Sequence, residues 1–276
     1  MVFRLPKNDN YGGILKLKTI LITNDDGYEA EGILALREAL QPLGRVIVVA
    51  PASEKSACSH SVTLNEPLKL VEIEKDFYKV VDGTPSDCIY ISKDALLQDL
   101  KPDLVVSGIN RGSNMGEDIT YSGTVAGAIE GVLQGYQSIA ISRVLGETNR
   151  ENTDYGLAKK YIYKVVKKIF ENGSPLKKRE ILNINIPPNG DESKFEVTYA
   201  GHRLYSNNTH IYYSPRGKKL YWLGLHPLEW KDRDVDEKYR GYRSDFDAIF
   251  NGYISLTPIK IDLTSYERID SLKHWL

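Results

Sequence analysis

The stretch TILITNDDGYEAEGILALREAL, residues 19–40, decides the fold, because it predicts a strand, a polar loop and a helix in direct succession. The β-branched run TILIT, residues 19–23, is typical of a buried strand. The apolar residues of ILALREAL, residues 33–40, recur at helical spacing, and Gly44 is expected to cap this helix after Pro42 interrupts it. A strand that runs through a loop into a helix is the first part of a β–α–β unit.

The same order of strand and helix repeats along the chain. Further apolar strands are expected at residues 45–50, 104–108, 138–142 and 181–187, and a small antiparallel hairpin at residues 68–83. Helices are expected from residue 84, within residues 108–135 and over residues 153–171. The repeated order predicts an α/β fold, with a mostly parallel sheet that carries helices on both faces.

The helix expected from residue 84 has a complete start signal. Thr84 is expected to be its N-cap, Pro85 its first helical residue and Asp87 the acidic partner of a capping box. These three residues satisfy or remove backbone N–H groups that a helix start otherwise leaves without a partner. The sequence therefore predicts the beginning of this helix to the residue.

The character of the chain changes near residue 190. Residues 195–257 are rich in Tyr and alternate over short runs, which predicts antiparallel strands, and residues 264–276 predict a terminal helix. We therefore expect an N-terminal extension at residues 1–18, a catalytic core at 19–190 and a C-terminal extension at 191–276 that packs on the core. The aromatic residues of 200–240 and of the terminal helix exceed what a monomer exposes, which predicts a homo-oligomer.

The overall composition is that of an ordinary folded protein. The 276 residues carry 36 basic and 37 acidic side chains, so no net field attracts nucleic-acid polymers or anionic membranes. Only two cysteines occur, and the N-terminus has no apolar signal region, so we expect a cytoplasmic protein. No apolar run approaches the ~20 residues that a membrane-spanning helix needs.

Three polar loops follow strands of the predicted sheet and should meet beyond the carboxyl ends of those strands. They carry Asn24, Asp25 and Asp26; residues 53–56, which include Ser56; and Asn110, Arg111 and Asn114. The adjacent carboxylates of Asp25 and Asp26 repel each other unless a cation or a shared proton compensates. A solvated loop or a helix cap is the alternative interpretation of this pair.

The candidate ligands at this rim are oxygen and amide groups, which favour Mg²⁺, Mn²⁺ or Ca²⁺. The five histidines show no zinc-binding spacing, and only His60, in the second loop, stays open as a site residue. Ser122, Gly123 and Thr124 are expected to open a helix whose N–H groups bind an anion. The small residues Gly127, Ala128 and Gly131 also favour close packing of that helix. A metal beside a helix start suggests a phosphate ester.

Several other phosphate-site and hydrolase motifs do not occur. The run GINRGSNMG, residues 108–116, lacks the spacing of a dinucleotide fingerprint, and the chain contains neither a P-loop nor a G-x-S-x-G elbow. The D-x-D-x-T pattern of aspartyl-phosphate phosphatases is also absent, since the carboxylates are adjacent. A covalent aspartyl-phosphate enzyme and a non-enzymatic nucleotide-binding module remain as alternatives.

Several segments together resemble the SurE family, the survival-protein-E nucleotidases. They are ILITNDDGYEAEGI, VVAPASEKSACSHSVT, DGTPSDCI, PDLVVSGINRGSNMGEDITYSGTVAGAIEG, LNINIPP and DFDAIFNGYISLTP. These matches run in order from about residue 19 to residue 264. The combination of NDDG with SGINxGxN and YSGTVxxAxEG is highly specific, although none of these motifs would suffice alone.

The resemblance implies a Rossmann-like core and a metal-dependent phosphatase that acts on nucleoside 5′- and 3′-monophosphates. It implies one divalent ion per subunit, Mg²⁺ or Mn²⁺, with ligands at Asp25, Asp26, Ser56 and Asn110, of which the two aspartates are catalytic. It places phosphate contacts at Asn114, Ser122, Gly123 and Thr124, and it implies a homodimer or homotetramer that exchanges C-terminal elements. The main activity could instead be on another phosphate ester or on polyphosphate.

The loop before Ser56 departs from the family pattern. Ala57 stands where many members have Gly, and Glu54 and Lys55 stand where many have Arg. Phosphate or base contacts from this loop are therefore not carried over from the family. The first 18 residues also lie outside the family pattern.

Overall fold

The computed structural model describes residues 17–98, 101–146, 153–205, 208–224 and 227–276. Nearly all of the expected N-terminal extension, residues 1–16, lies outside the described residues. In the described part of the chain no helix is both long and apolar enough to span a bilayer.

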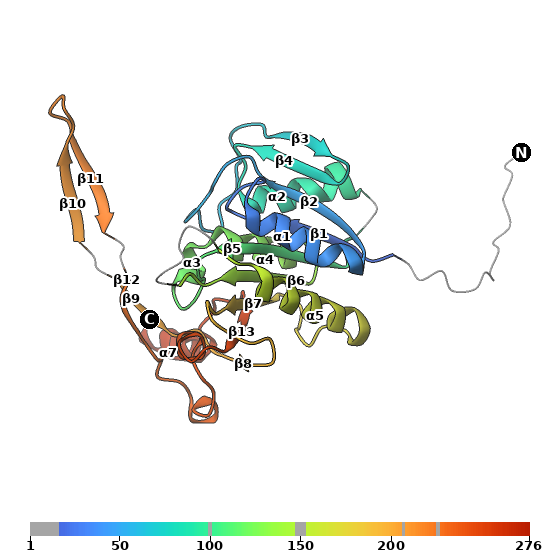
Figure 1. The fold of residues 1–276 in the computed structure, drawn as a ribbon. Coiled ribbons are helices and arrows are strands. Elements are labelled where there is room, and N and C mark those ends of the chain that lie inside the picture. The colour runs from blue at the N-terminus through green and yellow to red at the C-terminus, as the bar shows by residue number, and fades with distance from the viewer. Residues whose placement is uncertain (1–16, 99–100, 147–152, 206–207, 225–226) are drawn as a thin grey trace, which may run out of the picture.

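A nine-stranded sheet in the order β3-β4-β2-β1-β5-β6-β7-β13-β8 forms the centre of the molecule (Figure 1). The strands β4, β2, β1, β5, β6 and β7 run parallel, β3 and β13 are antiparallel to their neighbours β4 and β7, and β8 is parallel to β13. The predicted mostly parallel sheet is confirmed. The strands are β1 (Thr19–Thr23), β2 (Arg45–Pro51), β3 (Lys69–Glu74), β4 (Phe77–Val81), β5 (Leu104–Arg111), β6 (Ser138–Arg143), β7 (Glu180–Ile186), β8 (Phe195–Val197) and β13 (Ile254–Lys260).

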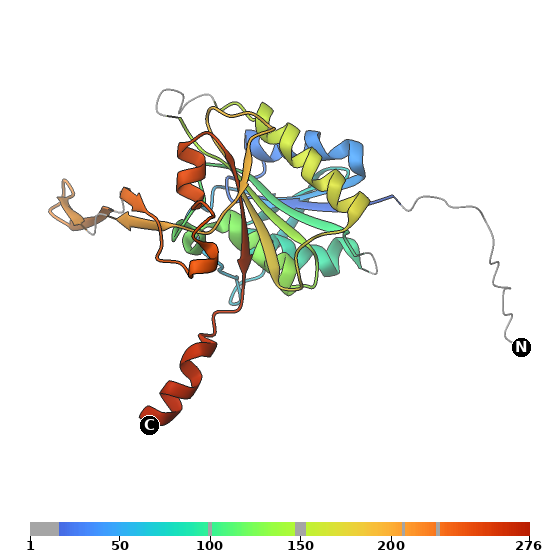
Figure 2. The same ribbon diagram turned by 90° about the horizontal axis from the view of Figure 1, so that it is seen from below.

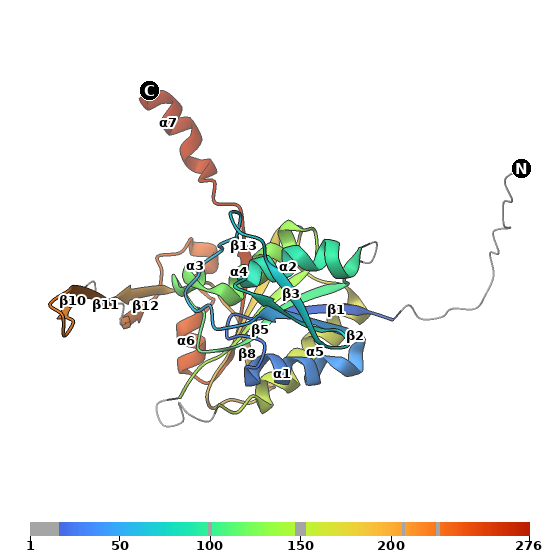
Figure 3. The same cartoon turned by 90° about the horizontal axis from the view of Figure 1, so that it is seen from above.

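Helices cover both faces of this sheet, as predicted (Figure 3). One face carries α1 (Glu31–Leu40) and α5 (Gly156–Asn172), and the other carries α2 (Pro85–Ser92) and α4 (Gly123–Leu133). The alternation along β1 produces this division, because Ile20 and Ile22 enter one core while Leu21 enters the other. Burial of these apolar side chains is the main contribution to stability, at roughly 25 cal/mol per Å².

The predicted start of α2 is confirmed. The Thr84 side chain accepts a hydrogen bond from the Asp87 N–H (3.2 Å), and Asp87 Oδ2 accepts one from the Thr84 N–H (2.9 Å), with Pro85 as the first helical residue. The helix continues into a π-helical turn at Lys93–Leu97. A cap of this kind stabilises a helix by about 1 kcal/mol.

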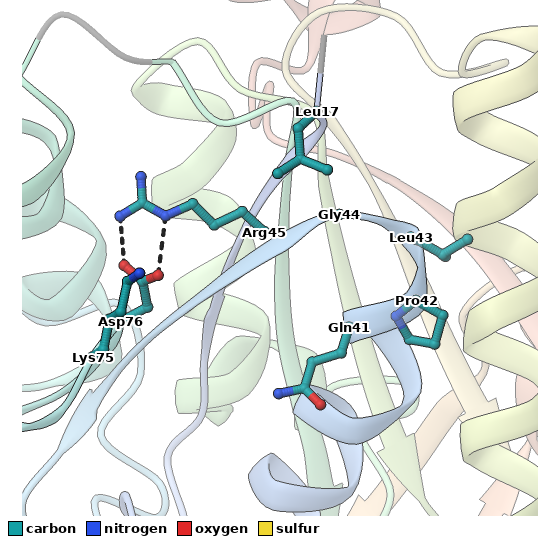
Figure 4. A pocket seen from close by; sticks show the side chains of 8 residues that line it. All are labelled: Leu17, Gln41, Pro42, Leu43, Gly44, Arg45, Lys75 and Asp76. Atoms are coloured by element: carbon teal, nitrogen blue, oxygen red, sulfur yellow. Dashed lines mark hydrogen bonds and ion pairs between the residues drawn. The ribbon is translucent and has the colours of Figure 1, made fainter. Parts of the chain in front are cut away.

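The end of α1 differs from the prediction. A 3₁₀ turn at Gln41–Leu43 follows the helix, and Gly44 caps this turn through its N–H to the Gln41 backbone oxygen, with an extended φ of 162° in place of a left-handed one. Glycine is required there for close approach, because a Cβ at Gly44 would lie 2.3 Å from the carbonyl oxygen of Lys18. Gly44 also lines a cavity of about 690 Å³ at the amino ends of β1 and β2, beside the ion pair of Arg45 and Asp76 (Figure 4). This cavity lies at the opposite end of the strands from the polar loops.

The C-terminal extension contains the predicted antiparallel strands. The strand β9 (His202–Tyr205) pairs with β12 (Pro227–Lys231), and β10 (Asn208–Tyr213) pairs with β11 (Lys219–Gly224) in a hairpin that stands away from the sheet (Figure 1). The terminal helix α7 (Ile269–Trp275) also projects from the body, preceded by a 3₁₀ turn at Tyr266–Arg268 (Figure 2).

Parts of this extension differ from the antiparallel pattern expected at residues 195–257. The strand β8 pairs in parallel with β13, and both continue the main sheet. A 3₁₀ turn at Glu237–Tyr239 and the helix α6 (Asp245–Phe250) were not predicted. Parallel pairing here depends on contacts between distant segments, which short alternating runs do not reveal.

Candidate active site

The three polar loops meet at the carboxyl ends of β1, β2 and β5. The backbone N–H of Lys55, in the second loop, donates to the backbone oxygen of Asp25 in the first (2.7 Å). The backbone N–H of Arg111, the last residue of β5, donates to Asp26 Oδ2 (3.1 Å). The topology of the parallel sheet thus brings residues 25, 55 and 111 into one rim.

Asp25 lies beneath the first turn of α4, with 4% of its surface exposed. The Thr124 hydroxyl donates to Asp25 Oδ1. Burial raises the pKa of Asp25, while the Thr124 hydroxyl and the backbone N–H groups of Gly123 and Thr124 act in the opposite direction. A Cβ at Gly123 would lie 2.8 Å from the Asp25 Cβ, so only glycine permits this approach. The start of α4 therefore faces a carboxylate of the rim.

Asp26 is less buried than its neighbour. The pKa of Asp26 is raised to about 6, chiefly by burial and also by repulsion from Asp25 and Glu54, against the lowering effect of the Arg111 N–H. Two adjacent carboxylates repel each other, and this repulsion favours the binding of a proton or of a divalent cation.

Asn110 lies near the end of β5, and Ser56 lies on the loop after β2. The strand β5 is irregular between Ser107 and Asn110, and Asn110 Nδ2 donates to the backbone oxygen of Gly112 (3.0 Å). Its Oδ1 is therefore the atom that could bind a cation. Ser56 is exposed, and its hydroxyl donates to Glu54 Oε1 (2.6 Å). The structure brings the Ser56 backbone to the rim and directs its hydroxyl to Glu54.

Asn114 is buried in a cluster of amides on the sheet. Its backbone N–H donates to Asn185 Oδ1 (2.9 Å), and its Nδ2 donates to Ser142 Oγ (2.8 Å). Its backbone oxygen accepts from Asn183 Nδ2 (2.8 Å) and Asn185 Nδ2 (3.0 Å). These bonds fix the backbone and side chain of Asn114. Asn183 and Asn185 were not predicted as site residues, although two amides in the apolar strand LNINI were a visible signal.

Ser122 serves as the N-cap of α4, because its hydroxyl accepts a hydrogen bond from the Val125 N–H (3.0 Å). Cys58, which was not predicted as a site residue, also lies at this rim. A Cβ at Gly123 would lie 2.9 Å from Cys58 Sγ, so the thiol adjoins the start of α4. Burial raises the pKa of Cys58, and the charge of Asp25 raises it further.

His60 contacts a carboxylate other than those of Asp25 and Asp26. Its Nε2 lies 3.0 Å from Glu130 Oε2 on α4, and Gln134 Nε2 donates to Glu130 Oε1 (2.7 Å). The hydrogen bond from His60 lowers the pKa of Glu130. Thr63 is bound in turn by Asp87 on α2, through its N–H (2.9 Å) and its hydroxyl (2.7 Å). These contacts hold the second loop against two helices.

The residues present fit a hard divalent cation. Asp25 and Asp26 are oxygen donors with raised pKa values, and Asn110 and Ser56 can add neutral oxygens. In the residues that the structure describes, no group of three or more His, Cys, Asp or Glu could hold a metal ion. A cation at this rim would therefore need Asn or Ser oxygens besides the two aspartates.

Comparisons with known proteins agree with the motifs. Residues 20–207 match the family described as survival protein SurE. The 5′-nucleotidase SurE of Helicobacter hepaticus is 53% identical over 264 residues, covering 94% of this chain and 99% of that protein. The 5′-nucleotidase SurE of Wolinella succinogenes is 52% identical, covering 94% of this chain and all of that protein.

A solved structure agrees with the observed fold. The SurE protein of Aquifex aeolicus has a TM-score of 0.75 and 43% sequence identity to this chain, and the match covers 93% of this chain and 99% of that one. The Rossmann-like architecture implied by the resemblance is confirmed. The sequence motifs, the match over residues 20–207 and these relatives lead to one conclusion: the chain belongs to the SurE family.

Proposed function

We propose that this protein is a divalent-metal-dependent phosphatase that hydrolyses nucleoside 5′- and 3′-monophosphates to nucleoside and phosphate. The observation that carries the proposal is the pair Asp25 and Asp26 at the rim, with the start of α4 directed at Asp25. Relatives about half identical to this chain bear the name 5′-nucleotidase SurE, which supports the substrate class.

One Mg²⁺ or Mn²⁺ per subunit would be held by Asp25, Asp26 and Asn110, with Ser56 joining when its hydroxyl leaves Glu54. When bound, such a cation supplies Lewis-acid activation of water and neutralises charge on the phosphoryl oxygens. Asp25 and Asp26 hold the site negative and orient the attacking water through carboxylate oxygens. The hydrogen bond from Thr124 fixes Asp25 in one orientation.

The phosphoryl group would be bound by Asn114 and by the first turn of α4, at Ser122, Gly123 and Thr124. The Asn114 side chain is held by the Ser142 hydroxyl, so it needs little reordering to take up an anion. N–H groups at a helix start favour negative charge. Such positioning and electrostatic stabilisation account for most of the catalysis of phosphoryl transfer.

The test is a phosphate-release panel on the full-length protein. It compares purine and pyrimidine 5′- and 3′-monophosphates, sugar phosphates and polyphosphate, each with Mn²⁺, with Mg²⁺ and with chelator. Release from nucleoside monophosphates that depends on the cation supports the proposal. Tight nucleotide binding without phosphate release would favour a binding module, and trapping of a phosphorylated aspartate would favour the covalent alternative.

We also propose a homodimer or homotetramer that uses the C-terminal extension. The hairpin β10–β11 exposes a continuous series of large apolar side chains, and α7 exposes another. They are Ile211, Tyr212, Tyr213, Leu220, Tyr221, Trp222 and Leu223 on the hairpin, and Ile269, Leu272, Trp275 and Leu276 at the C-terminus. Such surfaces are typical of protein–protein contacts. Cys58 and Cys88 carry free thiols, which supports a cytoplasmic location.

A further inference from the structure

The segment between Asn114 and Ser122 connects the two halves of the proposed phosphate site. Asn114 is fixed on the sheet by buried amides, whereas Ser122 caps α4. The short helix α3 (Asp118–Tyr121) lies between them, and the Ser122 N–H donates to the Asp118 backbone oxygen (3.1 Å). The placement of one half relative to the other therefore depends on what holds residues 116–118.

Glu117 is held by three donors from the C-terminal extension. Its carboxylate accepts from His202 Nδ1 (2.8 Å), from the Arg203 backbone N–H (2.6 Å) and from Arg233 Nη2 (2.9 Å). Arg233 is itself oriented, because its Nε donates to the Ala200 backbone oxygen (2.7 Å). These three hydrogen bonds to Glu117, the clamp, join the loop after β5 to β9 and to the segment that follows β12.

The residues on either side of Glu117 are tied to the same extension. The Gly116 N–H donates to Asp245 Oδ2 (2.9 Å), and Asp118 accepts from Arg203 Nη2 (2.9 Å) and from the Tyr205 hydroxyl. Three consecutive residues of the loop are therefore held from outside the Rossmann-like core.

The clamp on Glu117 is charge-assisted. Partial burial raises the pKa of Glu117, but the hydrogen bonds from Arg203 and His202 and the charge of Arg233 outweigh it, so the pKa lies below its usual value. Hydrogen bonds between ionised partners are stronger than those between neutral groups. Glu117 is the member of the loop that gathers the most donors, and no step of the proposed mechanism uses it.

We propose that Glu117 is a positioning residue, which holds Asn114 and the start of α4 in the arrangement that binds the phosphoryl group. This inference rests on the proposed function, because it concerns the same phosphate site. Glu117 acts through the loop and does not touch the substrate. The extension would then have a part in phosphate binding as well as in assembly.

The test is Glu117→Gln in the full-length protein. Glutamine keeps the size and an oxygen acceptor but removes the charge that holds His202 and Arg233. Since hydrogen bonds to charged groups contribute well above those between neutral groups, we expect the KM for a nucleoside monophosphate and the Kd for inorganic phosphate to rise by about tenfold. kcat should fall less than KM rises, and Mn²⁺ affinity should stay unchanged.

Two further variants give the controls. Glu229→Gln removes an exposed carboxylate from β12 and should change neither constant. Arg233→Gln should raise KM as Glu117→Gln does. The KM of the double variant should be no higher than that of the more impaired single variant, because the two residues act as one unit.

The outcomes separate the two proposals. If the wild-type protein releases phosphate and Glu117→Gln keeps its KM and its phosphate Kd, the inference is wrong and the proposed function stands. A loss of activity that only follows the folded fraction, with KM unchanged, also overturns it. If the wild-type protein hydrolyses no phosphate ester, the proposed function is wrong, and the phosphate Kd still decides whether Glu117 shapes an anion site. A wild-type protein that neither hydrolyses nor binds phosphate contradicts both.

Discussion

The Thr124 hydroxyl donates a hydrogen bond to Asp25 Oδ1, which joins the first turn of α4 to the loop after β1. Both groups are buried, and the backbone N–H groups of Gly123 and Thr124 also act on the Asp25 carboxylate. The carboxylate that we assign to the cation and the helix start that we assign to the phosphoryl group are therefore held as one rigid unit.

Replacing Thr124 by Val should slow phosphate release by roughly tenfold to a hundredfold, because the change removes a hydrogen bond to a buried carboxylate. Thr124→Ser keeps the hydroxyl and should stay within a few-fold of wild type. Steady-state kinetics with saturating Mn²⁺ measures both variants. Equal rates for Val and Ser would show that the hydroxyl plays no part.

Replacing Asp25 or Asp26 by Asn should reduce turnover on the order of a thousandfold or more, because the cation is expected to supply several kcal/mol of transition-state stabilisation. The fold should survive, because the substitution removes one of two carboxylates that repel each other. Turnover and melting temperature must be measured on the same preparation with excess Mn²⁺. Near-normal phosphate release with a lowered melting temperature would instead indicate a structural pair.

Removing divalent cations with EDTA should abolish phosphate release, and Mn²⁺ or Mg²⁺ should restore it, because the proposed ligands are all hard oxygen donors. Elemental analysis of the restored protein gives the number of ions per subunit, which we expect to be one. Full activity in chelator from protein that contains no metal would rule out the proposed mechanism.

Light scattering at micromolar concentration should give a mass of two or four times 31.2 kDa. The variant Trp222→Glu places a charge on the exposed face of β11 and should shift the mass toward the monomer. The matched variant Lys219→Glu changes the charge of the same strand without removing apolar surface, and it should shift the mass much less. A wild-type mass near 31.2 kDa would contradict the proposed assembly.

The buried carboxyl group of Asp245 should make the stability of the protein depend on pH. Burial raises the pKa of Asp245 from 3.8 to about 6, against the lowering effect of the N–H groups of Gly201 and Gly116. The folded protein therefore holds this proton more tightly than the unfolded chain, and the contribution to stability is greatest below the unfolded pKa and is lost as the pH rises through 6.

The expected size follows from this shift. The difference in free energy of unfolding between wild type and Asp245→Asn should be larger near pH 4.5 than near pH 7.5 by about 2 kcal/mol. Urea titration at each pH measures the difference. A difference that stays constant with pH would show that Asp245 titrates alike in the folded and unfolded states.

Local signals predicted much of the core. The capping box of Thr84 and Asp87 involves neighbours in sequence, and β1 spans the five residues expected of it. The end of α1 was predicted in part: Gly44 caps the 3₁₀ turn that follows the helix, but the reason for a glycine there is the carbonyl of Lys18, which a local pattern does not show. β5 extends beyond the expected Gly108 to Arg111, through an irregularity that periodicity does not detect.

Part of the site could also be predicted from local signals. Asp25 and Asp26 lie just after β1, so parallel topology alone places them at the rim. The orientation of the Ser56 hydroxyl could not be predicted from the sequence, because it depends on the neighbouring Glu54 carboxylate. The contact between Gly116 and Asp245 joins residues 129 positions apart, and no spacing rule reveals a partner at that distance.

The insertion of β13 next to β7 has a consequence for synthesis of the protein on the ribosome. The strands β1 to β7 are complete once residue 186 has emerged, but β13, the second neighbour of β7 besides β6, begins only at residue 254. Until then β7 is an open edge that can pair with the strand of another nascent chain. Premature termination between these strands would therefore yield a product prone to aggregation, even though its entire Asp25–Asp26 loop is present.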